Sequence, residues 1–326
     1  MAEIIKVENL TKVFKFAIKN PEHGFFRNLF NPDKKEIRAV DNISFTVERG
    51  ESVAFIGPNG AGKSTTIKML TGILFPSSGN ISVLGLKPQE QRQKLCYKIG
   101  TVFGQRSQLI FNLPVRDSFR LFGKIYELSD RAIKQRENEL IDLFDIKDFI
   151  DQTVRKLSLG QRMRAEIAVS LIHNPGIIFL DEPTIGLDIV AKRKLRETLS
   201  MLNTKFGTTI FLTSHDAGDI EALCKRTIVI NFGKVVLDTE TDSLQRKFLT
   251  QKHVRVDFKD VVKIPKIAGT KLIESNGRSA QYTVNTARNS LNDILKEIIS
   301  NYAVDDMDVE NPLLEEVISS IYQQKN

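Results

Sequence analysis

The sequence has 326 residues, 41% of them hydrophobic and 27% charged, which is typical of a globular chain with one large domain or two unequal ones. Its apolar runs are only a few residues long, as at residues 177–180, whereas a membrane helix needs about 20. The N-terminus lacks the apolar stretch of a secretory signal, so we expect the protein in the cytosol. The formal charge of +7 suits nucleic acid, an anionic membrane face or a nucleotide-binding protein equally well.

The cysteine content bears on zinc sites and disulfides. Cys96 and Cys224 are the only cysteines and lie far apart in the sequence. A zinc knuckle within this chain is therefore excluded, and a disulfide framework is not expected. We expect both thiols to be reduced core residues.

The first two thirds of the chain alternate between strand-like and helical patterns. Residues 4–10 predict a strand, and residues 15–38 predict an inserted excursion, because two Asn-Pro pairs bracket an aromatic cluster there. Further β-branched runs lie at residues 42–47, 52–57, 79–84, 98–103, 176–181, 208–213 and 226–231. Helical patterns between most of these runs favour an α/β fold with a parallel sheet.

Two regions depart from this alternation. Consecutive helical patterns from about residue 106 to 172 predict a separate helical subdomain. From residue 251 the pattern changes again, with strand-like residues 254–258 and 279–284 before a helix. The apolar positions of that helix have i, i+3, i+4 spacing and are Leu291, Ile294, Leu295, Ile298 and Ile299. With a last helix beginning at Asn311 and Pro312, residues 251–326 are predicted to form a small α+β domain after a main domain at 1–250.

The first chemical motif is "GPNGAGKST" at residues 57–65, directly after a predicted strand and before a predicted helix. It fits the phosphate-binding pattern G-x-x-x-x-G-K-[ST] in the context that this pattern requires. Backbone N–H groups and the helix N-terminus would cradle phosphates, while Lys63 neutralises charge and Ser64 ligates Mg²⁺. The predicted binding residues are Gly57, Pro58, Asn59, Gly60, Ala61, Gly62, Lys63, Ser64 and Thr65.

The second motif, "GIIFLDEPTIGLD" at residues 176–188, places two carboxylates at the end of an apolar strand. Ligands of open α/β sheets bind at this end of the strands. Asp181 is expected to orient Mg²⁺ and Glu182 to polarise the attacking water as a general base. Two such carboxylates are more often solvated turn residues, and only their pairing with the phosphate loop makes the motif specific.

Four further features indicate a narrower class of nucleotide-binding protein. "KLSLGQRMR" at residues 156–164, Asp188, "LTSHD" with His215, and "VFGQRSQL" with Gln105 together resemble the signature, D-loop, H-loop and Q-loop of ABC-type ATPases. The resemblance covers residues 4–245, in the expected order. It implies a P-loop NTPase core of the ABC type, with a mixed sheet, RecA-like helices and a helical subdomain, followed by the small C-terminal domain.

The resemblance also implies roles for individual residues. By the family pattern, Gln105 senses Mg²⁺ and the water, His215 contacts the γ-phosphate and Phe14 stacks on adenine, with Phe16 as a competitor. In isolation, a buried core histidine would be the default reading of His215. The residues expected to bind ATP held by a second subunit are Ser158, Gly160, Gln161 and Asp188.

The signature departs from the family at one position. Leu159 stands where the family usually has glycine, which leaves the backbone donors in place but restricts the conformation and adds bulk. We therefore expect activity to persist. The alternative interpretation is a capped core helix with two surface arginines.

Within the family, the chain is most similar to ATP-binding subunits of exporters like those for daunorubicin. This resemblance implies ATP and Mg²⁺ as ligands, a second ATP-binding subunit as partner, most simply in a homodimer, and separate membrane permease subunits. The protein would then lie on the cytoplasmic face of the cell membrane. An importer ATPase, or a soluble ABC ATPase acting on nucleic acid or ribosomes, remains an alternative. The single uninterrupted cassette argues against the latter, so no nucleic acid is expected.

The insertion carries a separate hypothesis. Phe25, Phe26, Leu29 and Phe30 alternate with basic residues in it, as in segments that lie on lipid headgroups. We expect this insertion to lean on the membrane subunit or the lipid surface, with an ordinary surface loop as the alternative.

Overall fold

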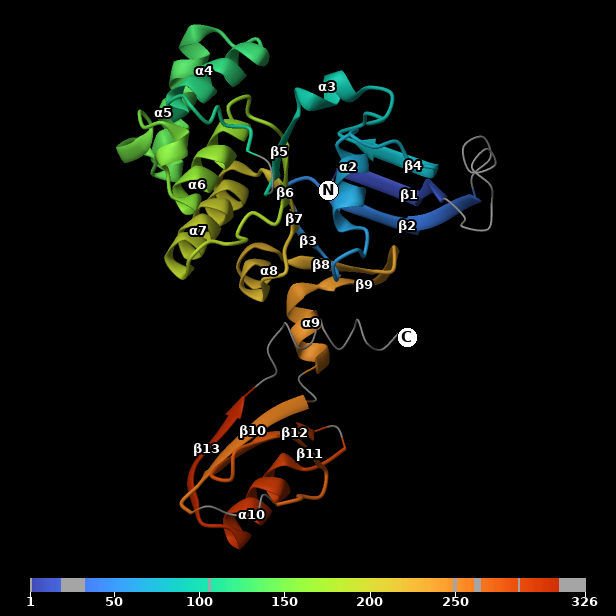
Figure 1. Ribbon diagram of the computed structural model, residues 1–326, viewed down its shortest axis with the longest axis vertical. Coiled ribbons are helices and arrows are strands. Elements are labelled where there is room, and N and C mark those ends of the chain that lie inside the picture. The colour runs from blue at the N-terminus through green and yellow to red at the C-terminus, as the bar shows by residue number, and fades with distance from the viewer. Residues whose placement is uncertain are drawn as a thin grey trace. The chain divides into compact units, whose positions relative to one another are not determined.

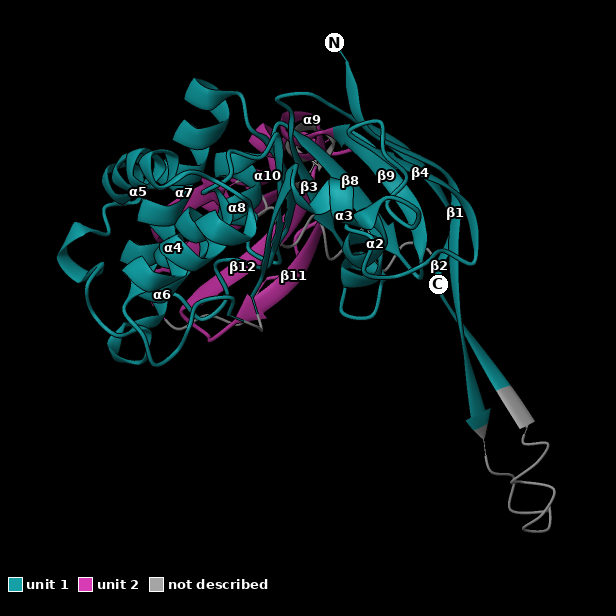
Figure 2. Cartoon of the chain, turned by 90° about the horizontal axis from the view of Figure 1, so that it is seen from above, with its two compact units in different colours: residues 1–239 teal, residues 240–326 magenta. Residues whose placement is uncertain are grey.

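The computed structural model describes residues 2–18, 33–104, 107–248, 251–260, 265–286 and 288–310. Gln105, the greater part of the predicted insertion and the predicted last helix therefore lie outside the described residues. The backbone divides into two compact units, Met1–Thr239 and Glu240–Asn326 (Figure 2). Each unit is described on its own below.

Unit 1 is built on a six-stranded sheet with the order β5-β6-β7-β3-β8-β9. The first five strands in that order pair in parallel. β9 returns beside β8 after a two-residue turn at Phe232 and Gly233, both with positive φ, as tight antiparallel hairpins require. The strands are β3 (Ser52–Ile56), β5 (Ile99–Phe103), β6 (Ile177–Asp181), β7 (Thr209–Thr213), β8 (Arg226–Asn231) and β9 (Lys234–Glu240).

A second, antiparallel sheet in unit 1 has the order β2-β1-β4. Its strands are β1 (Glu3–Ile18), β2 (Asp33–Glu48) and β4 (Ser78–Val83). β4 pairs with β1 only as far as Thr11, whereas β2 continues along β1 to the pair Ile18 and Asp33. The two ends of the predicted insertion are thus the far end of this two-stranded ribbon (Figure 2).

Helices cover the parallel sheet on both faces (Figure 1). On one side α2 (Lys63–Leu70) lies between the two sheets, beside the short α3 (Arg92–Cys96). On the other side lie α6 (Leu159–Ser170), α7 (Ile189–Phe206) and α8 (Ala217–Leu223). The views in Figure 1 and Figure 2 agree on this arrangement. The predicted α/β core with a parallel sheet is therefore confirmed.

The core between the two sheets is aromatic. The rings of Phe45, Phe55, Phe179 and Phe211 pack with centroids 5.5–6.1 Å apart. All four side chains are buried. Phe55, Phe179 and Phe211 lie on strands that are covered on both faces and therefore consist of continuous apolar runs, whereas Phe45 lies on β2, where buried and exposed residues alternate. Cys224 is also buried and Cys96 is only half-buried, so the expectation of a core position was wrong for Cys96, and both thiols are free.

The helical subdomain consists of α4 (Val115–Ile125) and α5 (Asp130–Phe144) packed against α6. Two short 3₁₀ turns, Lys147–Phe149 and Val154–Lys156, lead from α5 into α6. A buried ion pair ties α4 to α5, with the Arg116 guanidinium donating to Glu137 and, at 2.6 Å, to Asp151. These contacts hold α4, α5 and the segment that leads into α6 together.

Unit 2 begins at Glu240, whereas the sequence predicts a boundary at residue 251. A four-stranded antiparallel sheet of order β11-β12-β10-β13 is covered on one face by α10 (Leu291–Asn301). Its strands are β10 (Gln251–Phe258), β11 (Thr270–Ser275), β12 (Ser279–Asn285) and β13 (Val304–Glu310), and α9 (Thr241–Phe248) precedes them. Ile294 and Ile298 of α10 are buried, whereas Ile299 is 59% exposed.

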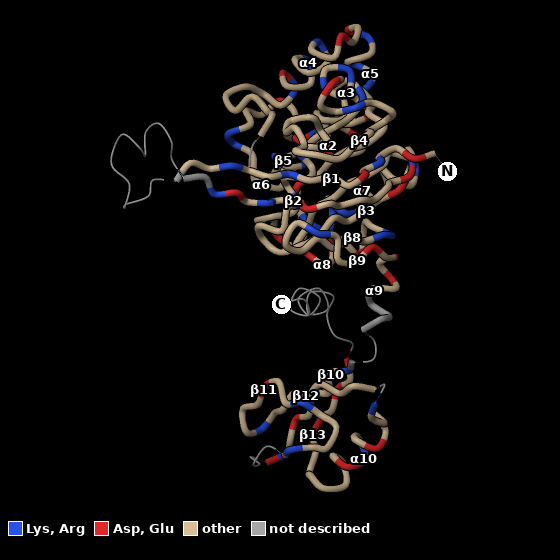
Figure 3. The backbone as a smooth tube through the Cα atoms, turned by 90° about the vertical axis from the view of Figure 1, so that its right-hand side faces the viewer, with Lys and Arg blue, Asp and Glu red and all other residues tan. Residues whose placement is uncertain are grey.

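Two global features bear on function. Within the described part of the chain, none of the helices has the length and apolar character to traverse a bilayer. Basic and acidic residues are interspersed along the described backbone of unit 1 (Figure 3).

Candidate functional site

Three glycines shape the loop between β3 and α2. A Cβ atom on Gly57 would lie 2.2 Å from the carbonyl oxygen of Ile230, and one on Gly62 would lie 2.4 Å from that of Ala39. Gly60 and Gly62 also have φ values of 81° and 110°, which favour glycine. The backbone can therefore close tightly around the start of α2, where its N–H groups and the helix dipole attract an anion.

Lys63 is the first residue of α2 and is only 5% exposed. Its Nζ donates to the carbonyl oxygen of Gly57 at 2.6 Å and lies 3.0 Å from Nε2 of His215. Burial lowers the pKa of Lys63, although the nearby carboxylates of Glu182 and Asp181 act in the opposite direction. A buried amine aimed along a glycine loop is suited to a phosphate group.

Asp181 ends β6 beside the same loop. Its Oδ1 accepts a hydrogen bond from Thr213 at 2.6 Å and lies 3.4 Å from the hydroxyl of Ser64. One hydroxyl and one carboxylate side by side fit Mg²⁺, which keeps several waters and takes its other ligands from phosphate oxygens. The described residues contain no group of three or more His, Cys, Asp or Glu side chains that could hold a metal unaided.

Glu182 and His215 meet next to Asp181. Oε1 of Glu182 lies 3.0 Å from Nε2 of His215, and the Glu182 backbone N–H donates to the carbonyl oxygen of Thr213 at 3.0 Å. Glu182 has a φ of 55°, a conformation that costs a non-glycine residue about 1 kcal/mol or more. Burial and then the charge of Lys63 lower the pKa of His215, so that the imidazole is mainly neutral near pH 7.

The predicted signature forms the start of α6. Ser158 is its N-cap, with Oγ accepting from the Gln161 N–H at 3.2 Å while the Ser158 N–H donates to Gln161 Oε1 at 2.9 Å. This reciprocal capping box leaves the Ser158 O–H proton for another acceptor. α6 and α2 lie on opposite faces of the six-stranded sheet (Figure 1). The helix that follows the phosphate loop and the helix that begins at the signature thus cover different faces of that sheet.

The signature contacts the turn that carries Asp188. A Cβ atom on Gly160 would lie 2.8 Å from Cβ of Ala191, and one on Gly186 would lie 3.1 Å from Cδ2 of Leu159. Asp188 itself caps α7, where its Oδ1 accepts from the Ala191 N–H at 2.8 Å. Glycine at 160 is therefore required by close helix packing, and Leu159 covers the adjoining turn.

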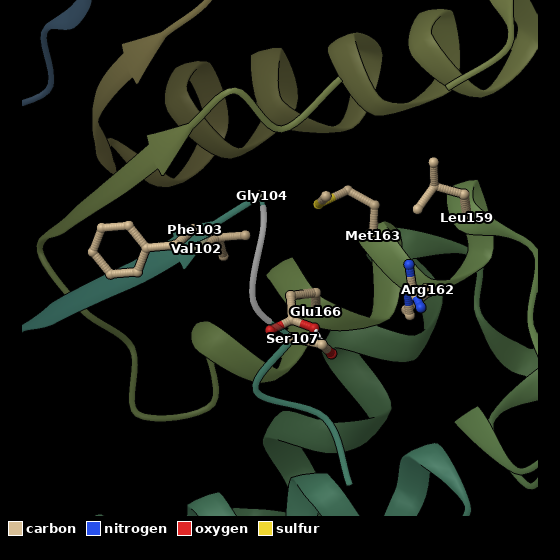
Figure 4. Close-up of a pocket in the computed structure, with 8 residues that line it drawn as sticks. All are labelled: Val102, Phe103, Gly104, Ser107, Leu159, Arg162, Met163 and Glu166. Carbon is tan, nitrogen blue, oxygen red and sulfur yellow. Dashed lines mark hydrogen bonds between the residues drawn. The ribbon is translucent and has the colours of Figure 1, made fainter. Parts of the chain in front are cut away.

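A cavity of about 140 Å³ lies between the end of β5 and α6 (Figure 4). Its walls include Phe103, Leu159, Met163 and the buried carboxylate of Glu166. Glu166 accepts from the hydroxyl of Ser107 at 2.5 Å and from the Gln108 N–H, and burial raises the pKa of its carboxyl group. The signature helix is thus bonded to the loop that follows β5.

The remaining predicted residues are less informative. Phe14 is half-buried on β1, with Lys12 Nζ 5.2 Å from its ring centroid and the ring of Phe16 6.3 Å away. Both rings lie on one strand, β1, where Phe16 is more exposed than Phe14. Gln105 lies outside the described residues.

Sequence reasoning missed two buried carboxylates beside the site, Glu166 and Asp219. Glu166 interrupts the apolar stretch at residues 165–169, and this lone charge among core positions was the available signal. Asp219 follows the His215 motif by four residues and looks like an ordinary first-turn helix acid.

Comparison with known proteins agrees with this geometry. Residues 40–185 match the ABC transporter family. The chain is 36% identical over 215 residues to the ABC transporter ATP-binding protein NatA of Bacillus subtilis, covering 66% of this chain and 87% of the relative. It is 35% identical to the daunorubicin resistance ATP-binding protein DrrA3 of Streptomyces coeruleorubidus, covering 65% of this chain and 66% of that protein.

Among solved structures, the fold is similar to a dimeric post-hydrolysis state of the ATP-binding cassette MJ0796 bound to ADP and Pi. The TM-score is 0.60 at 26% sequence identity, over 73% of this chain and 98% of that one. The matched portion corresponds in extent to unit 1 rather than to the whole chain.

Proposed function

Because the chain belongs to the ABC transporter family, we propose that it is an ATP-binding and ATP-hydrolysing subunit that drives export through separate membrane subunits. The observation that carries this proposal is the convergence of Lys63, Glu182 and His215 within 3.0 Å contacts at the glycine loop. A phosphate-binding amine, a carboxylate and a neutral imidazole at one point suit phosphoryl transfer to water.

Each side chain has a role in this proposal. The glycine loop and Lys63 hold the β- and γ-phosphates, and Ser64 with Asp181 holds Mg²⁺, which neutralises charge on the phosphate oxygens when bound. Glu182 orients the attacking water and accepts its proton. His215 donates from its imidazole to the γ-phosphate and keeps Glu182 in place.

The position of the signature supports a head-to-tail pair. Ser158 and the N-terminus of α6 have the chemistry of an anion site, yet α6 covers the face of the sheet opposite to α2, the helix that Lys63 begins. A second ATP-binding subunit, most simply another copy, would place its own phosphate loop against this signature. The solved cassette that resembles this fold is itself dimeric.

The direction of transport is proposed from the relatives. One of them bears a daunorubicin-resistance name, which favours export, with the protein peripheral on the cytoplasmic face of the membrane. An importer ATPase or a soluble ABC ATPase is the alternative. Purification of the chain bound to an integral membrane permease would favour transport, and a flux assay in vesicles would give its direction.

The test of the chemistry is Glu182→Gln. Removing a general base typically costs about 10²–10⁴-fold in rate, and nucleotide binding should persist because the loop is intact. A matched control is Glu197→Gln on the exposed side of α7, where the carboxylate pairs only with Arg193 among the contacts seen. A Glu182→Gln variant that retains more than about a tenth of the wild-type rate would exclude Glu182 as the base.

A further inference from the structure

The carboxylate of Asp219, on α8, is fully buried and is used by no step above. Its Oδ2 accepts two hydroxyl donors, Ser214 at 2.6 Å and Thr184. Its Oδ1 accepts from Nε of Arg196 at 2.7 Å. A buried carboxylate is stable only when its oxygens are bonded and its charge is balanced, and both conditions are met here.

The two hydroxyl donors belong to the two turns that carry the reacting side chains. Thr184 lies two residues after Glu182, and Ser214 directly precedes His215. One oxygen atom of Asp219 therefore bonds both of the turns whose side chains Glu182 and His215 contact each other. Thr184 is 3% and Ser214 3% exposed, so water does not compete for these bonds.

Arg196 of α7 completes the arrangement. Besides Asp219, its guanidinium donates to Oδ1 of Asp216 at 2.8 Å, while Lys192 donates to Oδ2 of Asp216 at 2.5 Å. A Cβ atom on Gly218 would lie 2.8 Å from Nη1 of Arg196, so a glycine is needed for the guanidinium to lie against α8. The charge of Asp219 is thus balanced by a cation that is itself held in place.

We propose that Asp219 is a positioning residue that sets the spacing between Glu182 and His215 by bonding Thr184 and Ser214 to one oxygen. The inference rests on the proposed ATP hydrolysis with Glu182 as base. Without this link the two turns can shift independently. Misplacing a catalytic group by about 1 Å costs up to about 100-fold in rate.

The cleanest test removes the Thr184 hydroxyl, whose one hydrogen bond in the described structure is to Asp219. Thr184→Val should lower kcat about tenfold with KM for ATP within about twofold of wild type, and Thr184→Ser should restore kcat. The matched control is Thr198→Val, which removes a buried hydroxyl whose one hydrogen bond among the described residues is to the Lys194 carbonyl within α7. Its kcat should equal that of wild type.

A double variant separates a link from two independent structural losses. Thr184→Val and Ser214→Ala each break the same connection, so the double variant should be little slower than either single variant, whereas independent effects would multiply. If thermal melting shows that Thr184→Val does not fold, the Ser214→Ala variant alone should still lower kcat about tenfold, with KM for ATP unchanged.

Three results would overturn the inference while leaving the proposed function intact: Thr184→Val as fast as Thr198→Val, Thr184→Ser as slow as Thr184→Val, or multiplying losses in the double variant. Wild-type protein without Mg²⁺-dependent ATP turnover would instead defeat the proposed function, and with it this inference.

Discussion

Nζ of Lys63 and Nε2 of His215 lie 3.0 Å apart, and the same imidazole nitrogen lies 3.0 Å from Oε1 of Glu182. The nitrogen of a neutral imidazole either donates or accepts a hydrogen bond, so Lys63 and Glu182 compete for it. A γ-phosphate that attracts Lys63 would release His215 to donate. Binding of the substrate would then set which hydrogen bonds Lys63, Glu182 and His215 make.

This relationship predicts the effect of His215→Ala. ATP turnover should fall about 10- to 100-fold, because both the orientation of Glu182 and a donor to the phosphate are lost. ATP binding should persist, because the glycine loop and Lys63 remain. Steady-state turnover and titration with a fluorescent nucleotide measure the two effects separately. A variant that keeps full turnover would remove His215 from the mechanism.

Leu159→Gly tests the departure from the family signature. Leu159 packs over Gly186 and is 38% exposed, and it occupies the first position of α6. Its removal should lower the free energy of unfolding by about 1 kcal/mol, from lost packing and from the poor helix propensity of glycine. ATP turnover should stay within about tenfold of wild type, since the backbone donors remain. Urea denaturation measures the free energy of unfolding. A Leu159→Gly variant that is more stable than wild type would contradict the packing role of Leu159.

His173 predicts how stability depends on pH. Its Nε2 bonds the carbonyl oxygen of Ile99 at 3.0 Å, its ring stacks on Tyr126 with centroids 3.8 Å apart, and burial lowers its pKa from 6.5 to about 4. Between these values the unfolded chain binds a proton that the folded chain does not. Stability is therefore full above pH 6.5 and falls as the pH drops toward 4, by on the order of 3 kcal/mol at most.

The measurement is a series of urea denaturations at pH values from 7 to 4.5. His173→Gln retains a donor for Ile99 but does not titrate, so its stability should depend less on pH than that of wild type. Equal pH dependence in the two proteins would mean that His173 is not the group responsible.

Deleting residues 19–32, with a short glycine linker in their place, tests the membrane hypothesis for the insertion. The strands on either side pair as far as Ile18 and Asp33, so the ribbon can be closed there. ATP turnover in solution should be unchanged, and recovery of the chain with its membranes should fall. Replacing Phe25, Phe26 and Phe30 with Ser is the matched control of equal length, and should lower recovery as well. Unchanged recovery in both would favour an ordinary surface loop.

The strands and the phosphate loop were predictable because their signals are local. β-branched runs mark β3, β6, β7 and β8, and the glycine motif lies between one of them and a helix. Asp219 was not predictable, since its partners lie 5, 23 and 35 residues away and only the fold brings them together. The helical spacing of apolar residues in α10 also includes Ile299 among the core-facing positions, but Ile299 is 59% exposed. The apolar stripe of α10 is wider than the contact between this helix and the sheet.

The last prediction asks whether the signature serves another subunit. Lys63→Ala damages the phosphate loop, and Ser158→Arg places a bulky charge at the N-terminus of α6. Each variant should be inactive as a homodimer. If each site combines one subunit's loop with the partner's signature, a mixed dimer collects both lesions in one site and leaves the other intact. Mixing the two variants should therefore restore measurable ATP turnover.

A matched control tests whether the loss of a helix N-cap alone would explain the inactivity of Ser158→Arg. Ser129 is the N-cap of α5, where its side chain also accepts from the third N–H, that of Ala132 at 3.3 Å but without a reciprocal bond, so Ser129→Arg loses a side-chain cap of about 1 kcal/mol away from the signature. It should remain active alone. Because coupling between sites can suppress turnover, ATP-dependent dimerisation is followed by gel filtration alongside. If both variants fold and exchange subunits, the absence of both restored turnover and mixed dimers would mean that loop and signature act within one chain.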